Sequence, residues 1–126
     1  MKARYRFVAP YAKDALNLPV DDVDKVVPYY EKTFGFSVVA RQDLPVRKVI
    51  MERDDVKIGF AENGGDPSQE GCFFEVENLE AAFEEIKGKP ATGITFEENE
   101  FRGRPHRVFF EVAPDGLCYM IAEPRS

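Results

Sequence analysis

Hydrophobic and polar positions follow the same order twice along the chain. In the first passage, apolar residues alternate through 15–20 and then recur at helical spacing through 23–34. A period of two indicates a half-buried strand, and a spacing of three to four indicates an amphipathic helix. Asp22 can cap the start of this helix and Gly35 can end it. Pro28 lies inside the pattern and is expected to shorten or kink the helix.

Three strands are predicted after this helix, and the same series then returns in the second passage. Asn78 can cap the second helix, which carries apolar residues at helical spacing, and Gly88 can end it. The remaining elements are predicted from alternation and from the turns that bound them. Strands are expected at 36–41, 47–52, 56–61, 71–76, 94–97, 107–112 and 117–122, and the second helix at 79–86.

The chain therefore has the pattern of an α+β protein built as an internal repeat of strand, helix and three strands. We predict one domain over 1–126, with an N-terminal arm over 1–12, a first βαβββ unit over 13–62 and a second over 71–124. In each unit a helix covers one apolar face of the strands. The opposite faces are expected to form a cleft between two curved mixed sheets.

Several motifs resemble the vicinal oxygen chelate superfamily, which includes glyoxalases, extradiol dioxygenases and bleomycin-resistance proteins. The opening of the first unit, Leu16 to Asp22, carries part of this resemblance, and the turn Ala113-Pro114-Asp115-Gly116 resembles the D-P-D-G turn of the family. Tyr29-Tyr30 and Phe34-Gly35-Phe36 have the expected spacing. Asn17-Leu18-Pro19 and Ala122-Glu123 are most similar to the bleomycin-resistance branch. The resemblance implies a glyoxalase/bleomycin-resistance-type fold.

The resemblance also implies where a metal would be bound in this chain. Metal-dependent members take ligands from four equivalent positions, which here are Ala15, Gly59, Gly71 and Met120. None of these offers an oxygen or an imidazole to a divalent cation. The chain has a single histidine, His106. We expect no catalytic metal and no cofactor, although the many carboxylates leave a calcium or magnesium site open.

Strand alternation predicts which side chains face the cleft. A few charged groups among aromatic side chains are typical of a small-molecule site. The alternative is that the apolar members fill a collapsed cleft or a dimer contact. The predicted ligand-binding residues are Asn17, Lys57, Phe73, Glu75, Arg107, Phe109, Glu111, Cys118 and Met120.

The leading interpretation is a metal-independent protein that binds and sequesters an antibiotic or another small organic compound. Glu75 and Glu111 are the candidates for acid/base catalysis in the alternative, a divergent glyoxalase-like lyase or isomerase. A third interpretation is an interaction module whose cleft is closed by its own dimer.

Composition limits the classes of molecule that the protein is expected to bind. The formal net charge of −6 disfavours nucleic acid and favours a cationic ligand. No apolar stretch is long enough to span a membrane. Only Cys72 and Cys118 are present, which fits reduced thiols in the cytoplasm.

The N-terminal arm predicts a homodimer. Tyr5, Phe7, Val8 and Tyr11 place much apolar surface ahead of the first strand. An arm packed on a second subunit, or swapped into it, would bury this surface, with Pro10 as a stiff hinge. The alternative is that the arm packs on its own chain.

Overall fold

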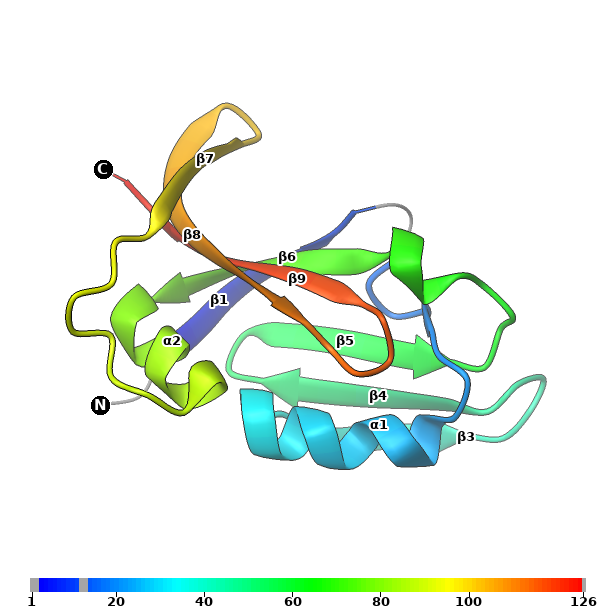
Figure 1. The fold of residues 1–126 in the computed structure, drawn as a ribbon. Coiled ribbons are helices and arrows are strands. Elements are labelled where there is room, and N and C mark those ends of the chain that lie inside the picture. The colour runs from blue at the N-terminus through cyan, green and yellow to red at the C-terminus, as the bar shows by residue number, and fades with distance from the viewer. Residues whose placement is uncertain (1–2, 12–13, 126) are drawn as a thin grey trace.

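The computed structural model describes residues 3–11 and 14–125 as two curved mixed sheets and two helices (Figure 1). The parts of the predicted arm and first unit at 1–2 and 12–13 lie outside the described residues. Sheet A has the strand order β1-β6-β9-β8-β7, and sheet B has the order β2-β5-β4-β3. The strands are β1 (Arg4–Pro10), β2 (Leu18–Pro19), β3 (Ser37–Gln42), β4 (Lys48–Arg53), β5 (Val56–Ala61), β6 (Gly71–Glu77), β7 (Glu97–Phe101), β8 (Arg104–Val112) and β9 (Cys118–Pro124).

The order of elements confirms the predicted α+β class. Strand β2, helix α1 (Val23–Tyr29) and strands β3 to β5 form the first unit, and β6, α2 (Leu79–Lys87) and β7 to β9 form the second. In each unit the first strand pairs in parallel with the last, which gives both sheets the same internal order. Strand β1 adds an antiparallel edge to sheet A.

Both helices begin and end at the residues that the sequence indicates. The side chain of Asp22 accepts a hydrogen bond from the amide of Asp24, and that of Asn78 accepts one from Ala81. Gly35 and Gly88 end the helical segments with φ of 73° and 69°, which glycine adopts without strain. Pro28 has no N–H to donate, and α1 continues after Tyr29 as a π-helical turn over Tyr30–Phe34.

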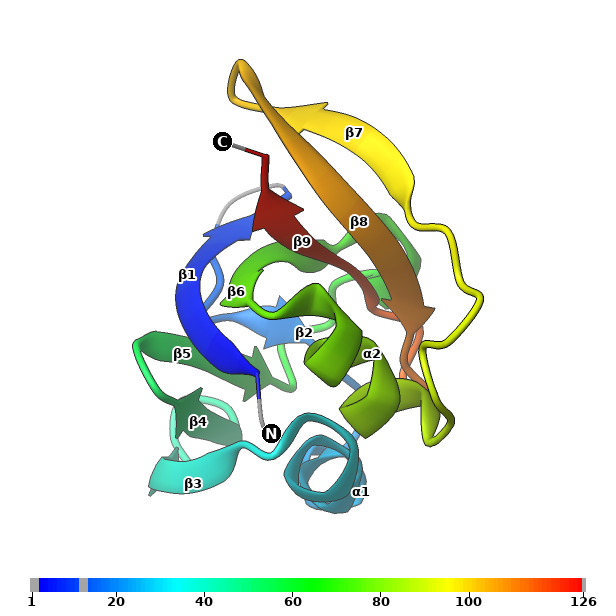
Figure 2. The same cartoon turned by 90° about the vertical axis from the view of Figure 1, so that its left-hand side faces the viewer.

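Helix α2 lies on the inner side of the curved sheet A (Figure 2). One large core lies between the two sheets, on their helix-bearing faces. The ring of Tyr30 contacts Phe60 of sheet B at a centroid distance of 4.4 Å and Tyr119 of sheet A at 5.8 Å. Phe34 similarly packs on Phe74 of sheet A. Since the π-helical turn after α1 contacts both sheets, the space between them within this chain is filled, and the opposite face of each sheet is turned outward.

Two predicted strands are displaced in the structure. The strand expected over 15–20 is reduced to Leu18–Pro19, because the Asp14 carboxylate accepts hydrogen bonds from the Leu16 amide and the Asn17 side chain and holds a turn there. The strand expected at 94–97 lies instead at β7, where it pairs with β8. The described residues contain no helix long and apolar enough to cross a membrane.

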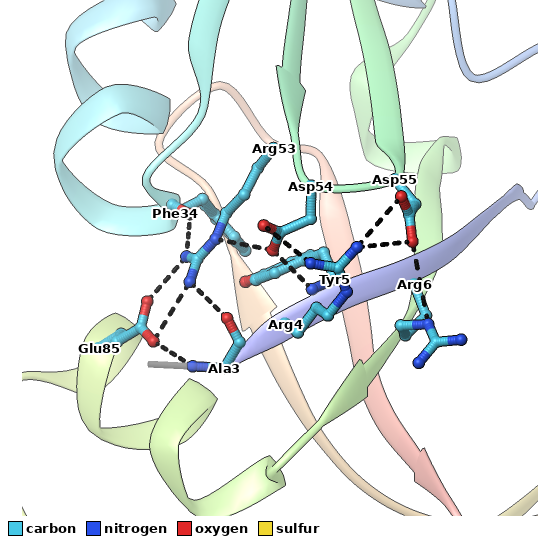
Figure 3. Close-up of polar contacts among 9 residues, drawn as sticks. All are labelled: Ala3, Arg4, Tyr5, Arg6, Phe34, Arg53, Asp54, Asp55 and Glu85. Atoms are coloured by element: carbon cyan, nitrogen blue, oxygen red, sulfur yellow. Dashed lines mark hydrogen bonds and ion pairs between the residues drawn. The ribbon is translucent and has the colours of Figure 1, made fainter. Parts of the chain in front are cut away.

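The first described residues are fastened to both units by Arg53, whose side chain is only 10% exposed (Figure 3). Its guanidinium donates to the carbonyl oxygens of Ala3 and Phe34 and to the Glu85 carboxylate, each at 2.7 Å. It also lies 4.6 Å from the ring centroid of Tyr5. Strand β1 is thus held at its start by the β4–β5 hairpin and by α2.

Candidate functional site

The outward face of sheet A carries a second, smaller apolar cluster. Ala9, Phe73, Val108 and Ala122 are buried there, with Phe101 and Met120 packed against them. Beside this cluster lies a hollow of about 290 Å³, close to the lower size of small-molecule sites. The residues that line this open-face hollow are Phe7, Phe73, Glu75, Phe101, Arg102, Arg104 and His106.

Strand register places these side chains together. Phe7 pairs with Glu75 across β1 and β6, and Phe73 pairs with Met120 across β6 and β9. The β7–β8 hairpin brings Phe101 back over Phe73, and the two rings stack at a centroid distance of 3.9 Å and an interplanar angle of 4°. Phe7 meets Phe73 edge-on at 6.3 Å. Three aromatic rings, one each from β1, β6 and β7, therefore line the hollow together.

The hollow carries charge of both signs. Glu75 is half-buried, and its side-chain carboxylate makes no hydrogen bond or ion pair with any other described residue. The guanidinium of Arg102 lies over the rings of Phe7 and Phe101, at 5.6 and 5.2 Å from their centroids. His106 is buried, packs edge-on against Phe73, and places Nδ1 2.9 Å from the carbonyl oxygen of Arg104.

The cleft predicted from the sequence agrees with this hollow only in part. Phe73 and Glu75 line it, and Met120 lies on the same face. Cys118 is also on this face, but beside Gly71 at the far end of β6. Burial raises the pKa of the Cys118 thiol, which lowers the fraction of reactive thiolate.

The predicted orientation of β8 is wrong by one residue. Five residues, Ala113 to Leu117, connect β8 to β9, and Val112 pairs with Cys118. This register turns Arg107, Phe109 and Glu111 toward the helices, and turns Val108 and Phe110 outward. A period-two pattern cannot distinguish the two registers here, because Val108, Phe109 and Phe110 are consecutive apolar residues.

Each of the three misplaced side chains has a partner on the helix face. Arg107 pairs with Glu80 of α2 and with Glu123. The ring of Phe109 packs against Phe83 of α2 at 5.4 Å. Glu111 pairs with Lys87 and accepts a hydrogen bond of 2.8 Å from the Tyr29 hydroxyl. Glu75 and Glu111 consequently lie on opposite faces of sheet A and cannot act as an acid/base pair.

The two site residues predicted in the first unit lie outside the hollow. Asn17 is exposed and holds the turn before β2, where its side-chain oxygen accepts from Lys48 at 2.8 Å. Lys57 lies on β5 of sheet B with a 61% exposed side chain, 3.9 Å from the Glu52 carboxylate.

Two of the four positions that correspond to family metal ligands, Gly59 and Gly71, have no room for a side chain. A Cβ atom at Gly71 would lie 1.8 Å from the carbonyl oxygen of Cys118, and one at Gly59 would lie 2.3 Å from that of Leu16. Neither position can therefore hold a side chain without a backbone shift. The amide of Gly59 instead donates to the carbonyl oxygen of Ala15. Over 3–11 and 14–125, no group of three His, Cys, Asp or Glu residues is placed to hold an ion.

Two further hollows are less suited to an organic ligand. One, of about 340 Å³, lies where the start of α1 meets the 113–116 turn, and is lined by Asp21, Asp22, Lys25, Val26, Tyr29, Pro114 and Asp115. Another lies beside the arm, and there Arg53 and Glu85 already satisfy each other. The open-face hollow is the one that combines several aromatic rings with charged groups that have no ion-pair partner among the described residues.

Five lining residues were missed as site residues: Phe7 of the predicted arm, and Phe101, Arg102, Arg104 and His106 of the β7–β8 hairpin. The signal that could have found the four hairpin residues is Arg102-Gly103, a two-residue turn in which both residues have positive φ, at 52° and 79°. Such turns close tight hairpins. Recognition of this turn would have paired Phe101 with Arg104 and carried alternation back along β8 to His106.

Comparisons with known proteins agree with this architecture. A protein from the mobile metagenome of V. Pseudocholerae superposes with a TM-score of 0.67 at 18% identity, covering 91% of this chain and 95% of that one. A bleomycin-binding protein complexed with bleomycin gives 0.62 at 22%, covering 90% and 99%. The fosfomycin resistance protein FosX of Listeria monocytogenes, complexed with Mn(II) and sulfate, gives 0.57 at 16%, covering 91% of each chain. At these identities the similarity establishes the fold.

No curated protein sequence matches the chain. The model of the glyoxalase/bleomycin resistance protein/dioxygenase superfamily, in contrast, matches residues 13–117, which span the first repeat unit and the second unit as far as the start of β9. The repeated βαβββ order, the two mixed sheets and this match lead to one conclusion: the chain belongs to the glyoxalase/bleomycin resistance protein/dioxygenase superfamily.

Proposed function

We propose that the protein binds a small organic molecule in the open-face hollow of sheet A and sequesters it without a metal and without changing it chemically. The observation that carries the proposal is the aromatic wall of Phe7, Phe73 and Phe101 around a space of about 290 Å³. Flat apolar walls with a few charged groups recognise planar organic ligands by contact area and orient them by charge.

An antibiotic is one candidate ligand. The similar bleomycin-binding protein was solved with bleomycin bound, and binding alone suffices for sequestration. The glycines at positions 59 and 71 support metal independence, since the family's ligand side chains have no room there. The net charge of −6 concentrates cations near the protein as a whole.

A homodimer in the cytoplasm is the assembly that we propose for this function. The outward faces of both sheets are open in the single chain, and Phe7 and Phe110 are 39% and 38% exposed on that of sheet A. A second copy would cover such a face and close the hollow. Strand β1 pairs with β6 of its own chain here, and the same pairing could be made by an arm swapped from the partner.

A divergent lyase or isomerase is the second candidate. Glu75 favours it, since this carboxylate faces an aromatic hollow and forms no hydrogen bond or ion pair with a described residue. A general base needs such access to a substrate proton. The helix-side position of Glu111 removes the second carboxylate, so Glu75 would have to act alone.

A thermal-shift screen followed by calorimetry tests the proposal. Candidate compounds are antibiotics, thiol adducts of methylglyoxal, and divalent metals alone, since a ligand of the folded state raises its stability. Each compound that stabilises the protein is titrated into wild type, Phe7→Ala and Leu44→Ala, and is then recovered for mass analysis. Leu44 is 83% exposed and serves as the matched control.

We expect Phe7→Ala to weaken binding by roughly tenfold, Leu44→Ala to leave it unchanged, and the recovered compound to keep its mass. A compound recovered in altered form would favour the enzyme. A saturable shift with a divalent metal would contradict metal independence.

A further inference from the structure

The arginines of the chain divide into two groups by their partners. Seven of the nine form ion pairs with carboxylates: Arg4, Arg6, Arg41, Arg47, Arg53, Arg107 and Arg125. Within 3–11 and 14–125, Arg102 and Arg104 alone have no carboxylate within 4.0 Å. Both line the open-face hollow.

This absence of partners is unusual for the composition of the chain. Asp and Glu number 23 against 17 Lys and Arg, so a guanidinium rarely lacks a carboxylate neighbour. Arg102 is the first residue of the two-residue turn, and Arg104 follows the turn as the first residue of β8. Both side chains are thereby held at the same rim, next to the stacked rings of Phe73 and Phe101.

A guanidinium is suited to a planar anion for two reasons. It offers N–H donors in a flat fork that matches a carboxylate, and it stacks on aromatic faces. Arg102 already shows the second property, since it lies over Phe7 and Phe101. The N–H groups of its guanidinium donate to no described side chain.

We propose that the hollow takes a planar organic anion, an aromatic carboxylate, with the ring against Phe7, Phe73 and Phe101 and the carboxylate at Arg102 and Arg104. This inference rests on the proposed binding function and names the class of its ligand. It differs from the cation expected from the net charge. Ions screen distant charges beyond about 8 Å at physiological ionic strength, so the groups in the hollow outweigh the total.

Glu75 gives the site a direction. It is the one carboxylate among the residues that line the hollow, and it comes from β6 rather than from the hairpin. Like charges repel, so the carboxylate of the ligand lies at the arginine rim and away from Glu75. A hydrogen-bond donor on the opposite edge of the ring would meet Glu75.

Three probes with the same ring and different charge test the inference. They are 2-naphthoate, 2-naphthamide and 2-naphthylmethylammonium, each titrated by calorimetry into wild type at low and physiological salt. The double variant Arg102→Gln/Arg104→Gln removes the two charges at the rim. Arg41→Gln/Lys89→Gln removes two positive charges from exposed positions outside the hollow and is the matched control.

We expect the affinity order naphthoate, naphthamide, naphthylmethylammonium. Arg102→Gln/Arg104→Gln should weaken the binding of naphthoate by roughly tenfold or more and leave the affinity for naphthamide nearly unchanged. The control variant should bind all three probes as wild type does. Glu75→Gln should strengthen naphthoate about two- to fivefold, since it removes a like charge.

Different failures have different meanings. If the ammonium probe binds most tightly and Phe7→Ala weakens it, the hollow is a ligand site and the anion inference is wrong. If naphthoate binds equally to the rim and control variants, Arg102 and Arg104 do not recognise its charge. If none of the probes binds, the inference fails together with the proposal that this hollow takes aromatic ligands.

Discussion

Cys72 and Cys118 lie on opposite faces of sheet A, since Cys72 belongs to the main core and Cys118 pairs with Gly71 on the outward face. Both are free thiols. Burial raises the pKa of Cys72 to about 12 and also raises that of Cys118. Thiolate is the reactive form, so both should react slowly with alkylating reagents.

We expect Cys118 to react with iodoacetamide before Cys72, because its side chain is the less buried of the two. Peptide mass analysis over time measures the order. The unfolded chain, prepared without reductant, should give two reactive thiols. A disulfide in that sample, or faster labelling of Cys72, would show that the assignment of the two faces is wrong.

Asp115 is a half-buried acid on the turn that connects β8 to β9. Burial raises its pKa above the ordinary value, although hydrogen bonds of 2.9 Å from the Leu117 amide and the Tyr30 hydroxyl favour the charged form. The folded state therefore binds a proton at higher pH than the unfolded state. Protonation of this group adds stability as pH falls through the folded pKa.

Asp115→Asn should consequently cost more stability in acid than at neutral pH. The variant lacks the titrating group, so the difference from wild type in free energy of unfolding should grow from about pH 7 to about pH 4. Urea denaturation at a series of pH values measures it. A difference that shrinks toward acid would mean that the hydrogen bonds outweigh burial.

At the scale of elements, the register of β8 decides the role of Phe109. This ring packs against Phe83 and Phe96 on the helix face, at 5.4 and 6.0 Å. Phe109→Ala should therefore destabilise the fold by about 3–5 kcal/mol, the usual cost of a buried ring. Binding of a hollow ligand by the folded fraction should be unchanged, in contrast to Phe7→Ala. Weaker ligand binding with an unchanged free energy of unfolding would instead support the register in which Phe109 faces the hollow.

This strand also marks the limit of what the sequence could predict. Helix ends could be predicted, because Asp22, Gly35, Asn78 and Gly88 each have a local chemical reason for their position. Alternation assigned β6 and β9 correctly, since their inner faces are apolar at every second residue. The faces of β8 are both apolar near Phe109, and only the length of the following loop fixes them.

The β7–β8 hairpin was missed for a related reason. Its strand β7 is almost wholly polar, so hydrophobic periodicity gives no signal over Glu97–Glu100. Phe101 is part of the site because it stacks on Phe73, a residue distant in sequence. Alternation within one strand does not predict such a contact. Hydrophobic periodicity could therefore not identify the four of the seven lining residues that lie on this hairpin.

The hydrogen bonds by which Arg53 holds the start of β1 lead to a further prediction. Arg53→Lys retains the charge but loses the fork that reaches Ala3, Phe34 and Glu85 together. We expect a loss of roughly 1–3 kcal/mol in the free energy of unfolding. Lys57→Gln, which breaks an exposed pair with Glu52, should cost less than about 1 kcal/mol. Equal effects of the two variants would mean that the arm is not held here.

At the scale of the whole molecule, the open faces of the two sheets predict association. Phe7, Phe110 and Val112 are exposed large apolar residues on sheet A, and Val39 is another on sheet B. We expect a homodimer by sedimentation velocity at micromolar concentration, in which such surface is covered. A sedimentation coefficient of the monomer over the whole concentration range would contradict this expectation.

The central claim is that the outward face of sheet A holds the ligand, and amide chemical-shift mapping with 2-naphthoate tests it most directly. The account predicts that the largest shifts fall on Phe7, Phe73 and Phe101 to Arg104, and that they saturate with one ligand per chain. Shifts centred instead on Asp21, Tyr29 and Asp115, or no saturable shift at all, would contradict it.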